Sequence, residues 1–164
     1  MSLTIESTTS PESADLIRNF LNGRYSGVLA TADAVGIPHA AVVYFTLDGD
    51  FSLTFGTKTE TQKHKNIEEN KQVAFVVYDE VEQSVVQITG RVEVVEDEGK
   101  KQSIFSNMSR SSAERSQTAL PPAEKLWAGE YIAMRIVPNV IKMTIYARPN
   151  SDDEDLFETI LFSE

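Results

Sequence analysis

The chain has 164 residues, with 25 acidic against 15 basic side chains, a net charge of −10 and no cysteine. This acidity excludes nucleic acids and anionic membranes as expected partners, because both are bound through clustered lysine and arginine. Without cysteine, disulfides and thiol chemistry are excluded. There is no signal-peptide pattern, and no apolar run approaches the ~20 residues of a membrane span. We therefore expect one domain over residues 1–164, in the cytoplasm.

The first half of the chain predicts one helix and four strands. A serine-proline pair opens an amphipathic pattern over residues 11–22, and Gly23 is typical of a helix end. The strand-like runs are residues 25–33, 38–47, 50–57 and 72–79. An Asp-Gly pair between the second and third runs is a hairpin signal, so we expect an antiparallel meander.

Between the third and fourth runs, residues 60–70 predict a short helix with an unusual charge order. Its lysines come early and its glutamates late, which opposes the helix dipole. A bound anion near the helix start would explain this order. Hydroxyls of Thr57 and Thr61, ammonium groups of Lys58 and Lys63, and free backbone N–H groups can form such a site. An ordinary capped surface helix is the alternative that this stretch alone leaves open.

The second half predicts further strands and a polar segment. Residues 84–97 alternate as a long strand whose phase changes at Gly90, which indicates a bulge. A helix is expected within residues 96–108 and a mobile loop at 109–122. One or two strands broken near Pro138 follow. The acidic and apolar tail, residues 149–164, is expected either to fray or to dock on a partner subunit.

About six strands and two or three short helices predict a mainly β fold, an antiparallel barrel with helices. The only histidines are His39 and His64, so no metal site is expected. No P-loop, GxGxxG or GxSxG motif occurs, which argues against the usual NTPase, Rossmann and hydrolase classes. Any chemistry is therefore expected to come from a bound organic cofactor.

Four segments, in order and spacing, resemble the pyridoxamine 5′-phosphate oxidase-like family of flavin-binding split β-barrels. They are GVLATAD, GIPHAAVVYFTLDGD, FSLTFGTKTETQKHKNIEENKQVAFVVYD and VVQITGRVEVVED, within residues 27–97. The resemblance implies a six-stranded antiparallel split β-barrel with a few short helices. It also implies a homodimer with FMN at the subunit interface.

The resemblance also implies positions for the cofactor. The phosphate contacts would be Thr57, Lys58, Thr61, Gln62 and Lys63. The flavin ring would lie along His39, Ala40, Ala41, Val42 and Val43. Gln87 stands two residues after Val85, which occupies the place of the family's flavin-contacting glutamine. Trp127 is a loose counterpart of a C-terminal tryptophan that grips pyridoxal phosphate in the oxidase.

Several departures argue against vitamin B6 oxidation. Gln62 replaces the arginine of the oxidase's Ser-Arg-Lys motif, and the C-terminal arginine has no clear match. The expected function is therefore an FMN-dependent oxidoreductase acting on an unidentified small substrate. A non-catalytic flavin carrier or redox sensor is the alternative, as is a relative that uses F420 or haem.

Overall fold

The computed structural model describes residues 4–6, 9–115, 130–147 and 157–163. The helices are α1 (Pro11–Asn22), α2 (Gln62–Glu69) and α3 (Glu98–Arg115). The strands are β1 (Thr4–Ile5), β2 (Ser26–Ala32), β3 (Pro38–Leu47), β4 (Leu53–Lys58), β5 (Gln72–Asp79), β6 (Ser84–Val94), β7 (Tyr131–Ile145) and β8 (Glu158–Ser163). The expected mainly β fold is confirmed.

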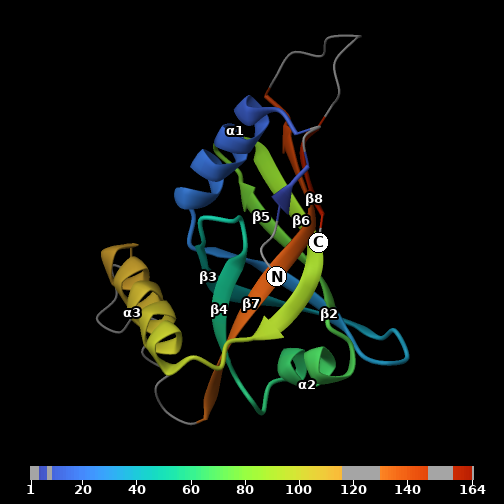
Figure 1. Ribbon diagram of the computed structural model, residues 1–164, viewed down its shortest axis with the longest axis vertical. Helices are drawn as coiled ribbons and strands as arrows, with labels where there is room; N and C mark the ends of the chain where they lie inside the picture. The colour runs from blue at the N-terminus through green and yellow to red at the C-terminus, as the bar shows by residue number, and fades with distance from the viewer. Residues whose placement is uncertain (1–3, 7–8, 116–129, 148–156, 164) are drawn as a thin grey trace.

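Six strands close into an antiparallel barrel (Figure 1). The order is β7-β4-β3-β2-β5-β6, and β6 pairs back with β7. Strands β8 and β1 extend the sheet from the free part of the β7 edge. The barrel interior is filled by large apolar side chains that alternate along the strands, such as Phe55, Phe75 and Ile88. The predicted six-stranded antiparallel barrel is therefore confirmed.

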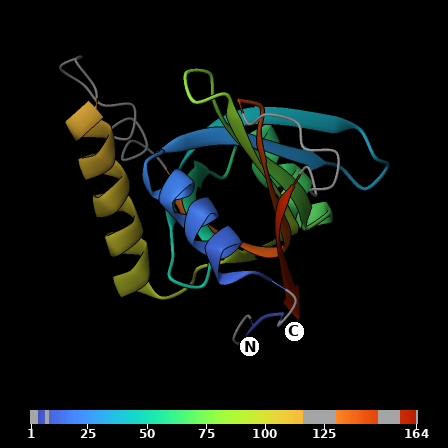
Figure 2. The same cartoon turned by 90° about the horizontal axis from the view of Figure 1, so that it is seen from above.

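The strand order differs from the predicted meander at β5. Strands β2, β3 and β4 follow one another in the sheet, but β5 pairs with β2 instead of β4. Helix α2 makes this possible, because it contacts β2 and β3 and carries the chain across one end of the barrel. Helix α1 lies at the other end and inserts Ile17, Phe20 and Leu21 into the core (Figures 1 and 2).

Strand β7 is continuous, so the predicted break at Pro138 is wrong. One edge of β7 pairs with β4 at residues 131–136 and with β8 at 140–143. Pro138 falls between these two pairings, where its missing N–H removes no ladder hydrogen bond on that edge. On the other edge, the register shifts between Thr89 and Gly90, which confirms the predicted bulge.

Gly90 is required by this bulge, and we predict that Gly90→Ala destabilises the fold. An added β-carbon would lie 2.2 Å from the carbonyl oxygen of Val137, part of a paired strand that cannot move freely. We expect a loss of about 1–3 kcal/mol or more in the free energy of unfolding, measured with urea. Gly49→Ala is the control, because no atom lies within 4 Å of its added β-carbon. Equal losses in both variants would contradict the steric account.

Helix α3 runs through residue 115, so the predicted loop at 109–122 is wrong for residues 109–115. Residues 116–122 lie outside the described residues. The helix packs on the outside of the barrel through Ile104, Phe105 and Met108. Phe105 lies directly over Gly56 of β4, where an added β-carbon would be 2.3 Å from its ring. The ring of Phe105 thus packs against a strand position that has no side chain. This contact anchors α3 to the barrel, although the second half of the helix has a polar, loop-like sequence.

The described end of the C-terminal segment packs on the sheet of its own chain. Residues 158–163 form β8, which pairs with β7 and with β1, and Ile160 is fully buried. The part of the tail at 149–156 lies outside the described residues. Strand β8 is therefore packed within its own chain and gives no support for a dimer.

Candidate functional site

Helix α2 begins at a hydroxyl-rich corner of the barrel. Thr61 is its N-cap, and its Oγ1 accepts a hydrogen bond from His64 N at 3.4 Å. The same hydroxyl donates to Lys58 O at 2.9 Å. Thr57 Oγ1 lies 3.1 Å from Thr61 Oγ1 and is only 1% exposed. The Thr57 hydroxyl thus contacts the hydroxyl of the N-cap residue and helps to hold it in place. The first backbone amides of the helix have no hydrogen-bond acceptor within the helix.

Lys63 is a half-buried ammonium group at this helix start. Burial lowers the pKa of Lys63 below its ordinary value. The two glutamates of α2 have other partners: Glu69 Oε2 accepts from Ala34 N at 3.0 Å, and Glu68 Oε2 lies 3.6 Å from His64 Nδ1. Within the described residues Lys63 has no ion pair. A half-buried cation with no counter-ion in the described part of a chain of net charge −10 is the site's main electrostatic feature.

A chain of side-chain hydrogen bonds links the start of α2 to the barrel wall. Gln62 Nε2 donates to Asn66 Oδ1 at 2.8 Å, and Asn66 Nδ2 donates to Thr31 Oγ1 at 3.0 Å. Thr31 Oγ1 lies 3.5 Å from the carbonyl oxygen of His39, the partner of Thr31 in the β2–β3 ladder. Both Asn66 and Thr31 are buried. This chain fixes α2 relative to β3.

The five residues proposed on β3 divide between the two faces of the strand. Ala40 and Val42 are exposed on the outer face of the barrel. His39, Ala41 and Val43 have the opposite parity and turn toward the interior. A flat ligand on the outer face could therefore contact the side chains of Ala40 and Val42, and only the backbone of the other three.

The outer face around Val42 is apolar over three neighbouring strands. One cross-strand row consists of Val42, Val28 and Val76, and the next consists of Ala40, Ala30 and Ala74. Val42 is 68% exposed and Val28 is 40% exposed. Two contiguous rows of apolar side chains on an open sheet face are typical of an interaction surface.

The remaining predicted contacts are not gathered with the others. Gln87 is exposed on β6 and pairs with Val76, so it lies three strands away from β3 on the same face. At about 4.8 Å per strand this is roughly 14 Å. Lys58 ends β4 and is half-buried near the α2 cap, whereas Trp127 lies outside the described residues.

Sequence reasoning missed Asn66, Thr31 and the burial of His64, which is 8% exposed. Polar residues on a short, polar helix look solvated, and their partners are distant in sequence. The sequence contained only an indirect signal for these buried polar residues. Ile67 is the only apolar residue of α2, so the other residues on the buried face of this helix have to be polar.

Solved structures share this fold. A conserved hypothetical protein from Mycobacterium tuberculosis is 19% identical, with a TM-score of 0.66 over 93% of this chain and 98% of that one. A candidate pyridoxamine 5′-phosphate oxidase from Listeria innocua is 25% identical, with a TM-score of 0.61 over 82% and 98% of the two chains. General stress protein 26 from Bacillus anthracis is 23% identical, with a TM-score of 0.59 over 79% and 91%.

The same fold also occurs in proteins named for other cofactors. One is an F420 reductase that is 25% identical, and another is a haem storage protein from Vibrio cholerae that is 20% identical. A search of curated proteins gave no significant match. No helix in the described part of the chain is long and apolar enough to cross a membrane. The pyridoxamine 5′-phosphate oxidase family model matches residues 13–144, and the chain belongs to that family.

Proposed function

We propose that this protein binds FMN and acts as a flavin-dependent oxidoreductase on a small organic substrate. The observation that carries the proposal is the half-buried side chain of Lys63 in the first turn of α2, which has no ion pair among the residues that the structure describes. A phosphomonoester carries about −1.5 to −2 charges at neutral pH, so it would supply the missing counter-ion. The free amides at the helix start would donate hydrogen bonds to its oxygens, while the Thr61 hydroxyl, whose proton goes to Lys58 O, remains the helix cap.

The geometry around this proposed phosphate site fits a long ligand that runs from α2 to β3. The hydrogen-bond chain through Asn66 and Thr31 holds the helix start and the β3 backbone in a fixed relation. Ala40 and Val42 offer a low, apolar surface for a flat ring on the outer face of β3. When bound, FMN would supply hydride and electron transfer, and the protein would supply the orienting site.

The proposed functional unit is a homodimer formed through the apolar outer face of β3, β2 and β5. Its two rows of valine and alanine are exposed or half-buried in one chain and include Ala40 and Val42 of the ring surface, so a second copy would cover both the rows and the ring. A self-complementary two-fold contact is the default for such a face. The ring would then lie between subunits, where water is excluded.

A test with NADH or NADPH distinguishes an enzyme from a carrier. The flavin of an oxidoreductase is expected to be reduced in a saturable way by one of these donors, with loss of its visible absorbance, and reoxidised by an added acceptor. A flavin carrier or redox sensor would bind FMN but show no turnover with either donor. Haem is less favoured, because an axial histidine would have to be His39 or His64, and His64 is only 8% exposed.

A further inference from the structure

A cavity of about 730 Å³ lies at the opposite end of β4 from the proposed phosphate site at Lys63. It is bounded by the β3–β4 hairpin, the first turns of α3 and one residue of β7. Its volume is within the range of sites for small molecules. Its lining includes Thr46, Asp48, Asp50, Thr54, Asp97, Lys100, Ile104 and Arg135. None of them is part of the proposed flavin site.

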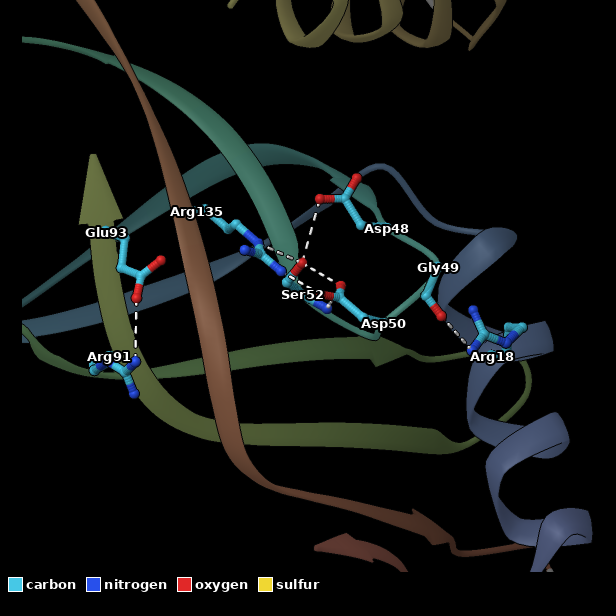
Figure 3. A network of polar contacts seen from close by, with 8 residues as sticks. All are labelled: Arg18, Asp48, Gly49, Asp50, Ser52, Arg91, Glu93 and Arg135. Atoms are coloured by element: carbon cyan, nitrogen blue, oxygen red, sulfur yellow. Dashed lines mark hydrogen bonds and ion pairs between the residues drawn. The ribbon is translucent and has the colours of Figure 1, made fainter. Parts of the chain in front are cut away.

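The floor of the cavity is a network centred on Ser52 (Figure 3). Arg135 forms an ion pair with Asp50 and donates from Nε to Ser52 Oγ at 2.8 Å. Ser52 Oγ lies 2.5 Å from Asp50 Oδ1 but 3.3 Å from Asp48 Oδ2. A serine hydroxyl has one proton to donate, and the shorter contact takes it. Asp48 is therefore left without a strong donor, and its other oxygen turns away from the network in Figure 3.

Among the charged residues around the cavity, the Asp48 carboxylate has no ion-pair partner in the described part of the chain. Asp50 already neutralises Arg135, and Asp97 caps α3 by accepting from Lys100 N at 2.7 Å. The Lys100 side chain is exposed at the rim and solvated. Asp48 is half-buried and forms no ion pair with any described residue. Burial raises the pKa of Asp48 above its ordinary value, and the Asp50 carboxylate acts in the same direction, against the hydrogen bond from Ser52 and the positive charges of Arg135 and Lys100.

We propose that this cavity binds a small organic cation, an ammonium group on a partly apolar body, with Asp48 as its counter-ion. The Thr46 and Thr54 hydroxyls, 2.6 Å apart, share one hydrogen bond and keep a further donor and acceptor capacity beside the carboxylate. Ile104 provides an apolar wall from α3. The inference does not depend on flavin binding.

The test is a titration of the full-length, isotope-labelled protein followed by amide chemical shifts. The probes are phenethylamine, its neutral analogue 2-phenylethanol and its anionic analogue 3-phenylpropionate, with ethanolamine as a smaller cation. The expected result is saturable shifts for a cation, centred on residues 46–54 and 97–107. Each uncharged or anionic analogue should bind at least about tenfold more weakly, as is typical when a charge-assisted hydrogen bond is lost.

Asp48→Asn is the matching variant, and Asp15→Asn, on the exposed side of α1, is its control. Asp48→Asn removes a half-buried charge, so the variant should stay folded and keep the dispersed amide spectrum of the wild type. A loss of cation binding in this variant then reflects the missing charge and not unfolding. We expect it to weaken the cation by about tenfold or more and Asp15→Asn to leave it unchanged. Unaltered binding by Asp48→Asn would overturn the proposal. So would equal binding of all three phenethyl probes, shifts centred elsewhere, or no saturable shift with either cation up to the millimolar range.

Discussion

Lys63→Met is expected to weaken FMN binding by about 10- to 150-fold. An ammonium bound to a phosphate at a helix start makes a charge-assisted hydrogen bond worth roughly 1.5–3 kcal/mol, at ~1.4 kcal/mol per factor of ten. Methionine keeps the length and the apolar stem of the side chain. Because the ammonium has no counter-ion among the described residues and burial lowers its pKa, its removal should not destabilise the apo protein. Fluorescence quenching of FMN measures the affinity.

Lys65→Met is the matched control, since Lys65 lies on the same helix but is exposed. Its removal changes the net charge by the same amount and is expected to alter FMN affinity by less than about fivefold, as for a surface charge worth under ~1 kcal/mol. Equal effects of the two substitutions would mean that the lysines act only through the general field of the protein.

Val42→Asp is expected to dissociate the proposed dimer. The side chain is 68% exposed in the single chain, so the substitution should leave the barrel folded. In a two-fold contact through the β3, β2 and β5 face, the carboxylate would be buried without a partner. A cost of about 3 kcal/mol or more corresponds to a rise in the dimer dissociation constant of about 100-fold or more. Sedimentation velocity across a concentration series measures this change.

Val81→Asp serves as the control for this prediction. Val81 lies in the turn between β5 and β6 and is 93% exposed, away from the valine and alanine rows. The same carboxylate there should leave the dimer intact. If Val42→Asp remains as dimeric as Val81→Asp, the dimer must use another face. If the wild type is a monomer while FMN is bound, the shared-site proposal itself is wrong.

The local parts of the fold could be predicted because their signals are local. A strand-like apolar run identifies β3, and alternating apolar residues identify β6. The stretch around residues 57–63 indicates a helix start, which the structure places at Gln62 and not at the expected residue 60. The change of phase identifies the bulge at Gly90. The pairing of β5 with β2 could not be predicted in this way, since it depends on a crossover through α2. The effect of Pro138 also depends on which strands border β7 at that residue.

In the candidate site, too, the contacts between residues close in sequence could be predicted, and those between distant residues could not. The hydroxyls and lysines of residues 57–63 are close in sequence, so their concentration at one helix start was visible. Asn66 and Thr31 are 35 residues apart, and Arg135 and Asp50 are 85 residues apart. Such pairs meet only when the barrel closes. Their contribution to anchoring α2 and to the floor of the second cavity therefore needs the structure.

We propose that the start of α2 binds the phosphate of FMN. The most direct measurement compares the dissociation constants of FMN and riboflavin for the wild-type apo protein, because these flavins differ only in the phosphate. The account predicts that FMN binds about 10- to 150-fold or more tightly than riboflavin, in proportion to at least one charge-assisted hydrogen bond. Riboflavin binding as tightly as FMN, or no binding of FMN, would contradict it.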